Sequence, residues 1–534
     1  MKSQHHAKAV LIVAATLAIG LGAAPGAAAA LDVSPDVSPG ATTISSCTTI
    51  DSPGEYALSG DLAGPPDEAC LVVAADGVTV DGNGHEIAAN GTSARGPAVR
   101  ATDAEDVTVR NVSLSGWQIG LTLDGVDGAT VGGVRVSGAD VVGMSVEGGS
   151  RSVTVTGVDV RNGTGGVRLD GASDVEVRDS SFSALTGTAV RVRGNGTDAT
   201  VRNVSVSDTS GVGVRVTGGD GVTVIDNRVS DVASHGIAVD DASAVTVEGN
   251  RLNGTSGVGI RVRGSPGTRT IDNVVTDTLS GGIQYVDSGH EVRRADGAER
   301  RPPQLWRIFG ASRGAIGGAR DPFAMQYPSS GRPLRDAIVT NNTVDGGYNH
   351  GVLVESTAGI IVSANRLERN DDGIHVSNSS DVSVRRNELR RNLDDGVAFG
   401  RVSDGAIRSN NATENGDNGF YVVGSDNLLA DNTALFNGDD GIDVQNATGS
   451  LVRRNVAAEN GDDGIFLRNA NNGTLTDNVV RDNRDDGIHL DRSTGNVVTE
   501  LAACGNDDET VMRTASARNN EVSLVACESE EEGA

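Results

Sequence analysis

A small residue followed by an apolar-x-apolar triplet recurs fifteen times between Gly120 and Gly487. The intervals between these marker residues are almost always 22 to 24 residues, and the one longer interval, from Gly282 to Gly351, is 69 residues, or three periods of 23. Self-similarity at this period predicts a solenoid, because each repeat can bury its apolar face only against the next repeat. The markers are Gly120, Gly143, Gly166, Ala189, Gly213, Gly236, Gly259, Gly282, Gly351, Gly373, Gly396, Gly419, Gly441, Gly464 and Gly487.

Apolar residues alternate with polar ones inside each repeat, as in Val214-Arg215-Val216 and Val222-Thr223-Val224. This alternation predicts two or three strands of about 3 to 5 residues in every coil, where a coil is one turn of the solenoid. Asn, Asp, Gly and Ser between the strands favour tight turns. The same strand of successive coils then stacks about 4.8 Å apart in long parallel sheets around a Val/Ile/Leu core. We therefore expect an all-β, parallel β-helix of about 15 or more coils.

Asparagines recur in register in two columns, and stacked amides can bond from coil to coil, so we interpret both columns as structural ladders. One column is Asn365, Asn387, Asn410, Asn432, Asn455 and Asn478, and the other is Asn370, Asn392, Asn415, Asn437, Asn460 and Asn483. With its NDDGIHV and VRRN units, the chain resembles right-handed parallel β-helix proteins of the pectin-lyase-like superfamily, and NosD-like proteins most closely. The resemblance covers roughly Val72 to Val525. It implies the fold more than the function, because one scaffold carries unrelated activities.

The ends of the chain and one internal segment depart from the repeat. Residues 1–30 have the layout of a secretory signal peptide, so we expect a secreted or cell-surface protein. Residues 31–71 are predicted to form an N-terminal cap, residues 72–527 the β-helix with a lateral insertion at 287–335, and residues 528–534 an acidic disordered tail. No later apolar stretch is long enough for a transmembrane segment, and the oligomeric state stays open.

Four cysteines lie near the two ends of the predicted rod. Cys47 and Cys70 are 23 residues apart, and so are Cys504 and Cys527. One period separates each pair, which places its members on neighbouring coils at a spacing that a disulfide can bridge. Two terminal disulfides would suit an oxidising compartment.

The formal net charge is −28, and the only two lysines, Lys2 and Lys8, lie in the predicted signal peptide. High acidity with arginine as the only strong base in the mature chain resembles a secreted protein of a halophile. The charge argues against nucleic acid or an anionic membrane as the partner of the whole molecule.

The middle residue of each apolar-x-apolar triplet is expected to point away from the core. Arginine occupies four of these positions within five coils, at Arg168, Arg191, Arg215 and Arg261. Because guanidinium groups pair with carboxylates and sulfates, an acidic polysaccharide or cell-surface glycan along this face is one hypothesis. The alternative is that these arginines pair with Asp and Glu of neighbouring turns. Later coils carry Leu353, His375, Ala398, Tyr421, Asp443, Phe466 and His489 at the same position.

Paired aspartates precede the marker glycine in the later coils. Oxygen ligands in stacked turns suit Ca²⁺, and we therefore predict Ca²⁺ as a candidate cofactor. The alternative is repeated turn chemistry, neutralised by Arg386, Arg391, Arg454 and ambient ions. The candidate calcium ligands are Asp371, Asp372, Asp394, Asp395, Asp439 and Asp440.

The predicted insertion at 287–335 contains Trp306, Phe309, Phe323 and Tyr327 in a chain that is 3% aromatic. An aromatic, arginine-rich loop on a rigid scaffold is a common place for ligand binding, and we assign Trp306 and Tyr327 as candidate sugar-binding residues. A lid that packs for stability, or an arm that docks a partner, is the alternative.

The strongest catalytic candidates follow the insertion. Tyr348 and His350 lie one coil before Asp372 and His375, and Asp395 follows one coil later. A histidine stacked on a carboxylate is suited to proton transfer, and two carboxylates are the machinery of glycoside hydrolysis.

We therefore expect binding, and modification by a lyase, hydrolase or epimerase, of an extracellular acidic polysaccharide. The resemblance to polygalacturonases extends only to NDDGI at Asn370–Ile374 and DDG at Asp394–Gly396. The resemblance to NosD-like proteins implies instead a non-enzymatic periplasmic or cell-surface accessory that serves copper-site maturation. Both functions stay open at this point.

Overall fold

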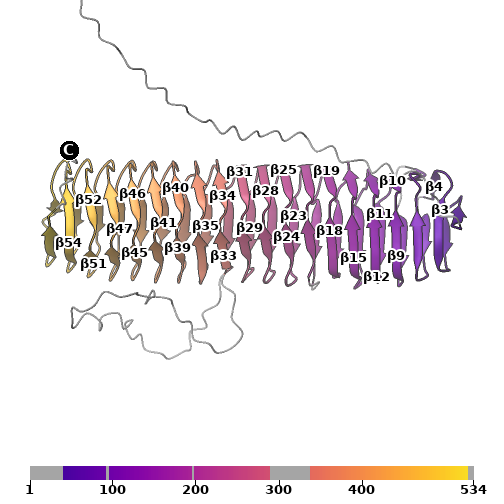
Figure 1. Cartoon of the computed structure of the whole chain (residues 1–534), viewed down its shortest axis with the longest axis horizontal. Coiled ribbons are helices and arrows are strands. Elements are labelled where there is room, and N and C mark those ends of the chain that lie inside the picture. Colours follow the sequence, from indigo (N-terminus) through magenta and orange to yellow (C-terminus); the bar gives the residue numbers. More distant parts are fainter. Residues whose placement is uncertain (1–39, 66, 92–94, 195–197, 289–336, 527–534) are drawn as a thin grey trace, which may run out of the picture.

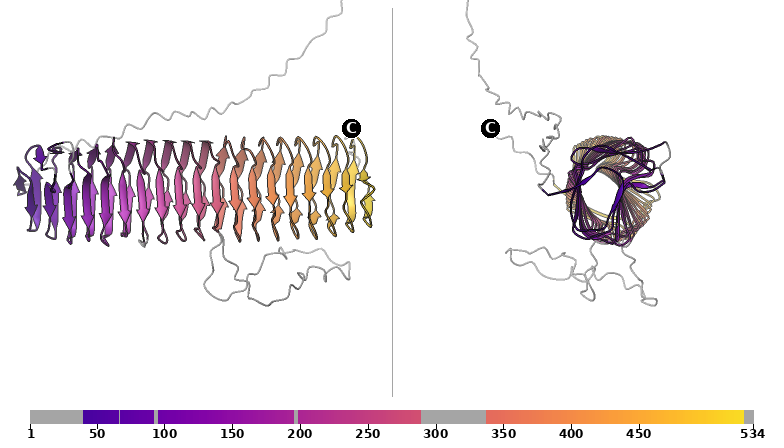
Figure 2. Two further views of the ribbon diagram at one scale, coloured as in Figure 1. Left: turned by 180° about the vertical axis from the view of Figure 1, so that it is seen from behind. Right: turned by 90° about the vertical axis from the view of Figure 1, so that its right-hand side faces the viewer.

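The structure of the chain is a computed structural model that describes residues 40–65, 67–91, 95–194, 198–288 and 337–526. Every regular element in these residues is a β-strand, and the strands form one straight rod of about 18 turns (Figure 1). The end view in Figure 2 shows the coils lying nearly on top of one another. The all-β parallel solenoid predicted from the repeat is confirmed. The described residues contain no helix long and apolar enough to cross a membrane.

Two parallel sheets run along the rod. Sheet A has 37 strands and takes two from most coils, beginning with β1 (Thr42–Ile44) and β3 (Gly54–Leu58) and ending with β54 (Val497–Cys504) and β56 (Glu521–Val525). Sheet B takes one strand from each coil, and most of its strands carry the repeated triplet. Its strands are β2 (Thr48–Ile50), β5 (Leu71–Val73), β8 (Pro97–Thr102), β11 (Ile119–Asp124), β14 (Val142–Glu147), β17 (Val167–Asp170), β20 (Val190–Arg193), β23 (Val214–Thr217), β26 (Ile237–Asp240), β29 (Ile260–Arg263), β32 (Ile283–Val286), β35 (Val352–Glu355), β38 (Ile374–Ser377), β41 (Val397–Gly400), β44 (Phe420–Val423), β47 (Ile442–Gln445), β50 (Ile465–Arg468), β53 (Ile488–Asp491) and β55 (Val511–Arg513).

The triplet in sheet B alternates between the core and the outer surface. Ile374 and Val376 of β38 are both fully buried in the core, whereas His375 between them is partly exposed. Register pairing continues from coil to coil, as in Leu353↔His375 and His375↔Ala398. The middle residues of the triplets therefore form one continuous row on the outer face of sheet B, which we call the outer row.

The marker residue is small because it packs against the next coil. A Cβ atom on Gly373 would lie 2.6 Å from the carbonyl oxygen of Gly396 and 2.9 Å from Nδ2 of Asn392. A larger side chain would push the coils apart, which explains why the repeat signature begins with glycine or, at Ala189, alanine.

Both predicted asparagine ladders are confirmed. Asn365 Nδ2 donates to Asn387 Oδ1 over 3.0 Å, and Asn392 Nδ2 donates to Asn415 Oδ1 over 2.9 Å. The first ladder begins earlier than the sequence columns indicated, and Asn273 Nδ2 donates to Asn342 Oδ1 over 3.0 Å. That bond and the pairing Ile283↔Val352 show that the 69-residue interval is a single step between neighbouring coils.

At the N-terminal end, the solenoid already includes residues assigned to the predicted cap at 31–71. Strand β1 pairs with β3, and β2 pairs with β5, all in parallel register. The predicted disulfide between Cys47 and Cys70 is present, with a Cα–Cα distance of 4.5 Å between neighbouring coils. Several other predictions concern residues outside the described part of the chain: the signal peptide at 1–30, the insertion with Trp306 and Tyr327, the acidic tail, and Cys527 as the partner of Cys504.

Candidate functional site

Three of the four arginines of the outer row form ion pairs with nearby acids. Arg168 donates to Ser145 Oγ over 3.1 Å and to Glu147 Oε2 over 3.1 Å. Arg215 and Arg261 bind the two oxygens of buried Asp240, at 3.0 and 2.6 Å. For these three side chains, the structure supports the pairing alternative, and Asp240 is a partner that the sequence analysis did not identify.

Arg191 differs from its neighbours in the outer row. It lies in register between Arg168 and Arg215, and no carboxylate of the described residues forms an ion pair with it. Burial lowers the pKa of the Arg191 guanidinium, and the nearby guanidinium groups of Arg215, Arg193 and Arg168 lower it further. The charge of Asp170 partly offsets these effects. Because no described carboxylate forms an ion pair with it, Arg191 has capacity for an anionic partner.

Asp372 joins two histidines at the start of the aspartate-rich coils. His375 Nδ1 lies 2.8 Å from Asp372 Oδ2, and His350 Nδ1 lies 3.0 Å from the same oxygen. The two imidazole rings are stacked, with centroids 4.4 Å apart and planes inclined by 22°. The stacking of coils thus brings together His350, Asp372 and His375, as the sequence predicted.

Burial of the Asp372 carboxyl would raise its pKa, but contacts with His350 and His375 outweigh this effect. The backbone N–H of Asp395 also donates to Asp372 Oδ1, over 3.1 Å. Together these contacts lower the pKa of Asp372 to about 2. The Asp372 carboxylate is therefore ionised at neutral pH. Tyr348, by contrast, is 80% exposed and its side chain points into solvent, so it does not extend this cluster.

The residue before the marker glycine forms a buried column beside the outer row. Each side chain in this column accepts the backbone N–H of the residue one coil later: Asp372 from Asp395, Asp395 from Asn418, and Asn418 from Asp440. The bonds are 3.0 to 3.1 Å long. The same contact continues to Asp463, Asp486 and Glu509. Asn418 shows that an amide fills this structural role as well as a carboxylate does.

Burial raises the pKa values of most carboxyls in the column. The pKa of Asp395 rises to about 8 because burial and the charge of Asp372 outweigh the hydrogen bonds from Asn418. Burial and the charges of Asp443 and Asp463 raise the pKa of Asp440 to about 9. Burial also raises the pKa of Asp463 to about 7. Several of these side chains therefore hold a proton at neutral pH.

An open groove of about 420 Å³ lies over the column and the outer row in this region. Its aspartates differ in ionisation, because burial and neighbouring charges raise the pKa of the more exposed Asp417 only to about 6. Tyr421 and Phe466 supply aromatic surface, and the Arg468 guanidinium lies 4.7 Å from the Phe466 ring centroid. The residues lining the groove are Asp394, Asp395, Asp417, Asn418, Tyr421, Asp439, Asp440, Asp443, Gln445, Asp462, Phe466 and Arg468.

The sequence analysis missed several of these residues as members of a site. Tyr421, Asp443 and Phe466 were recognised only as outer-row positions, while Gln445 and Arg468 were not considered. Asp443 and Gln445 are two residues apart in β47, so their side chains lie on the same face. Gln445 Nε2 donates to Asp443 Oδ2 over 2.7 Å. The signal that could have found them is the period-2 pattern of each sheet B strand, which places these residues on the outer face.

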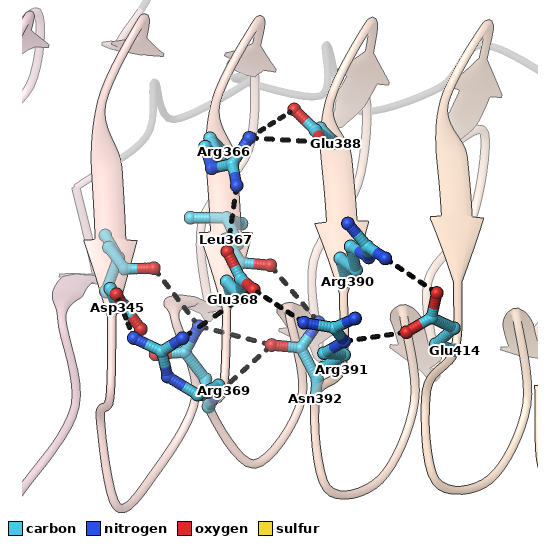
Figure 3. A network of polar contacts seen from close by, with 12 residues as sticks. Asp345, Arg366, Leu367, Glu368, Arg369, Glu388, Arg390, Arg391, Asn392 and Glu414 are labelled. Atoms are coloured by element: carbon cyan, nitrogen blue, oxygen red, sulfur yellow. Dashed lines mark hydrogen bonds and ion pairs between the residues drawn. The ribbon is translucent and has the colours of Figure 1, made fainter. Parts of the chain in front are cut away.

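Two of the three arginines in the sequence alternative pair with acids outside the aspartate column, and neutralisation by ambient ions stays a prediction. Arg391 binds Glu414 over 2.6 Å, and Arg454 binds Asp431 over 2.6 Å. Arg391 follows β40 (Glu388–Arg390) of sheet A, within a network of alternating charges that also involves β34 (Thr343–Asp345), β37 (Arg366–Glu368) and the turn after β43 (Asn411–Thr413) (Figure 3). The acids of this network have arginine partners, whereas in the described residues Arg468 is the one arginine that lines the groove.

The predicted calcium ligands fall into two groups. Oxygen atoms of Asp372, Asp394 and Asp395 lie within 4.8 Å of one another, and so do oxygens of Asp439, Asp440 and Asp462. Asp371 Oδ2 lies 3.9 Å from His350 Nδ1. Calcium binding at these carboxylates stays a prediction.

A second histidine cluster lies nearer the C-terminal end. His489 Nδ1 lies 3.1 Å from Asp463 Oδ2 and 3.8 Å from Asp486 Oδ2. Its ring also contacts Phe466, with centroids 4.8 Å apart. This cluster has one imidazole, where the first has two.

The family model for the right-handed β-helix region matches residues 143–295 and 403–523, which together make up just over half of the chain. The chain therefore belongs to the right-handed β-helix family. Residues 324–462 also match the family model described as periplasmic copper-binding protein (NosD). This segment contains His350, Asp372 and His375 and much of the groove. No curated protein sequence matches the chain.

Several solved structures are similar to the chain at low sequence identity. The Dettilon tailspike protein is 13% identical with a TM-score of 0.37, over 46% of this chain and 58% of its own. A variant of the periplasmic alginate epimerase AlgG is 11% identical with a TM-score of 0.37, over 72% of this chain and 77% of its own. The catalytic unit of a GH87 α-1,3-glucanase from Streptomyces thermodiastaticus is 12% identical with a TM-score of 0.42, over 64% of this chain and 59% of its own. The chain thus spans less than two thirds of the tailspike and of the glucanase.

Proposed function

We propose that the protein binds an extracellular acidic polysaccharide along the outer row and hydrolyses it in the acidic groove. One observation carries this proposal. The buried column retains aspartates at positions where Asn418 shows that an uncharged amide makes the same ladder bonds. Burying these carboxyls costs free energy, so a purely structural column would be more stable with asparagine. Carboxyl groups that hold or release a proton at the edge of a groove suit acid–base chemistry instead.

The roles of two adjacent carboxyls follow from their surroundings. Asp395 is buried and holds its proton up to a pKa of about 8, so it is the general acid that protonates the glycosidic oxygen. Asp394 is exposed at the groove. Partial burial and the charges of Asp372 and Asp371 raise the pKa of its carboxyl, but it is less buried than Asp395, so we assign it as the carboxylate of the pair. Oxygens of the two groups lie within 4.8 Å of each other. This upper limit is shorter than the roughly 6.5 to 9.5 Å of inverting glycosidases. We therefore assign the retaining arrangement, with carboxyls roughly 5 to 5.5 Å apart, in which the second carboxylate attacks the anomeric carbon.

The reaction then has two steps. As the leaving sugar departs with the proton of Asp395, the Asp394 carboxylate bonds to the anomeric carbon. In the second step, ionised Asp395 takes a proton from water, whose oxygen displaces Asp394 and restores both groups. The anomeric configuration of the product is retained.

Binding along the rod draws on two further features. The partly exposed ring of Tyr421 offers apolar surface for a sugar ring in the groove. No acid of the described residues forms an ion pair with Arg191, which lies several coils away from the groove. Its guanidinium offers a bidentate site for a sugar carboxylate or sulfate. Ca²⁺ held at Asp439, Asp440 and Asp462, apart from the acid and the nucleophile, would let an acidic polysaccharide bind in an acidic groove, and it stays part of the proposal. The Cys47–Cys70 disulfide is consistent with the proposed secretion.

A second candidate function is that of a non-enzymatic, NosD-like accessory protein. It is favoured by the match of residues 324–462 to the periplasmic copper-binding family model, because this segment contains the His350–Asp372–His375 cluster. An accessory of this kind would bind metal and show no turnover of polysaccharides.

The proposed function is tested by incubating the secreted protein with a panel of uronic-acid and sulfated polysaccharides in the presence of Ca²⁺. Reducing ends report hydrolysis, and ultraviolet absorbance of unsaturated ends reports lyase cleavage. We expect reducing ends without unsaturated ends, and a loss of at least about 100-fold in rate for Asp395→Asn. An amide fits this position, as Asn418 shows, so the variant should fold.

Asp486→Asn is the matched control. Asp486 occupies the same column and accepts the Glu509 N–H over 2.8 Å, but it does not line the groove. This variant should retain the wild-type rate. Release of unsaturated ends would show that the reaction is that of a lyase and not hydrolysis. The absence of any product would favour the accessory function. Equal rates for wild type and Asp395→Asn would remove Asp395 from the mechanism.

A further inference from the structure

We propose that His350, Asp372 and His375 form a binding site for one divalent first-row transition metal ion, of the zinc or copper type. The site lies at the boundary between the insertion and the aspartate-rich coils, with His375 in β38 and His350 and Asp372 in the turns before β35 and β38. The proposal names three specific ligands, and it does not depend on polysaccharide cleavage.

The three donor atoms are already spaced as ligands of one ion. Both imidazole Nδ1 atoms lie near the same carboxylate oxygen, Asp372 Oδ2, at 3.0 Å for His350 and 2.8 Å for His375. Ligand atoms at about 2.0 to 2.1 Å from a zinc ion lie about 3 Å apart at right angles and about 3.4 Å apart at the tetrahedral angle. Small rotations of the three side chains would therefore place an ion between them.

His350 supplies the observation that points to a missing partner. Its buried Nδ1 lies 3.0 Å from Asp372 Oδ2, within ion-pair distance but without hydrogen-bond geometry. A buried nitrogen without a hydrogen bond costs free energy. A metal ion shared with Asp372 and His375 would satisfy it.

The donor set selects the class of metal. Two imidazole nitrogens and one carboxylate suit zinc, copper, nickel or iron, whereas Ca²⁺ prefers oxygen ligands alone. The Asp395 N–H bonds Asp372 Oδ1 and holds that carboxylate in place, as outer partners of metal ligands commonly do. Asp371 Oδ2, at 3.9 Å from His350 Nδ1, is close enough to become a fourth ligand. We therefore expect a site separate from any calcium bound by the groove.

The experiment titrates Zn²⁺, and then Cu²⁺, into the chelator-treated full-length protein by isothermal titration calorimetry, in buffer with excess Ca²⁺ to occupy oxygen-only sites. We expect one ion per chain, with affinity lowered at least about tenfold in each of His350→Ala and His375→Ala. Asp372→Asn should weaken binding similarly, and its amide should fit the column as Asn418 does. Thermal unfolding without metal checks that each variant folds.

His489→Ala is the matched control, because His489 lies in the outer row and contacts aspartates, as His375 does, but has no second imidazole beside it. It should bind the ion as the wild type does. Electron paramagnetic resonance of the Cu²⁺ form should show two coordinated nitrogens in the wild type and one in either histidine variant. The proposal is overturned if no saturable binding occurs in excess Ca²⁺, if His350→Ala and His375→Ala bind as the wild type does, or if His489→Ala loses the ion.

Discussion

Asn418 occupies a position of the buried column that aspartates occupy in the coils before and after it. Its Oδ1 accepts the Asp440 N–H over 3.1 Å, and its own N–H donates to Asp395 Oδ1 over 3.0 Å. The amide and the carboxyl are nearly the same size, so the two residues differ here mainly in whether they can carry charge or a proton. Substitution between them therefore isolates the electrostatic cost of the column from its hydrogen bonds.

Asp440→Asn should stabilise the protein at pH 8 and have little effect at pH 4. Burial raises the pKa of Asp440 to about 9, so folding at pH 8 forces an ionised carboxylate of the unfolded chain to take up a proton. The amide avoids this cost, and we expect a gain on the order of 1 to 3 kcal/mol at pH 8. Thermal unfolding at the two pH values measures it.

The reverse change, Asn418→Asp, is the control for this prediction. It adds a carboxyl beside Asp395 and should lower the melting temperature at pH 8 more than at pH 4. Equal effects of either substitution at both pH values would show that the column carboxyls ionise normally.

The contact between His350 and Asp372 could be predicted from sequence, because both precede a marker glycine on adjacent coils. The opposite pKa shifts of Asp372 and Asp395 could not, since they depend on three-dimensional surroundings. Asp372 receives two imidazoles and a backbone N–H, whereas Asp395 is buried next to the charge of Asp372. The same limit applies to Tyr348, because the period gives its coil but not the direction of its side chain, which is 80% exposed.

The strands and ladders are the elements that the sequence predicted best. Their spacing follows directly from the period of 22 to 24 residues, and register pairing from Arg168 to His489 confirms that the triplets stack on one face. Pairing within the outer row was harder to predict. Asp240 reaches Arg215 and Arg261 in the two adjacent coils, whereas no acid in the described part of the chain forms an ion pair with Arg191. Which acid meets which arginine depends on side-chain reach as well as on register.

Asn410→Ala should break one ladder and destabilise the neighbouring coils. The Asn410 amide bonds Asn432 Oδ1 and the Val384 carbonyl, and its Oδ1 accepts two N–H groups of Asn387. Leaving these buried groups unpaired should cost about 2 to 4 kcal/mol. Hydrogen exchange at the Asn387 backbone N–H should accelerate, and the melting temperature should fall.

Asn411→Ala is the matched control for the ladder. Asn411 follows Asn410 in the same coil, and its Oδ1 accepts a hydrogen bond from Thr413 Oγ1 over 2.9 Å on the exposed surface, where water can replace the bond. We expect a cost below about 0.5 kcal/mol. A comparable loss in both variants would contradict the buried ladder as a main source of stability.

At the scale of the whole molecule, the raised pKa values predict how stability depends on pH. Asp395, Asp440 and Asp463 keep their protons in the folded rod up to about pH 8, 9 and 7, whereas an unfolded Asp releases its proton near pH 4. Between these values the folded state binds more protons, so its stability falls as the pH rises and the contribution is lost above pH 9. Thermal scans from pH 5 to 9 should show a falling melting temperature, and a constant or rising one would contradict this prediction.

Salt should stabilise the rod because its formal charge is −28. At about 1 M salt the screening length falls to about 3 Å, which suppresses repulsion between exposed acids on neighbouring coils. We expect the melting temperature to rise between 0.1 and 2 M NaCl, and to rise more at pH 8 than at pH 5. An unchanged melting temperature would show that the surface acids are already neutralised by their ion pairs, and would remove the support for adaptation to salt.

The most direct test of the central claim is the pH profile of reducing-end release from the best polysaccharide of the panel. If Asp395 is the general acid, release by the wild type should fall as the pH passes about 8, where Asp395 loses its proton. Asp395→Asn should release almost nothing at any pH, and Asp486→Asn should follow the wild-type profile. Release by Asp395→Asn at the wild-type rate, or a wild-type rate that keeps rising through pH 9, would contradict the account.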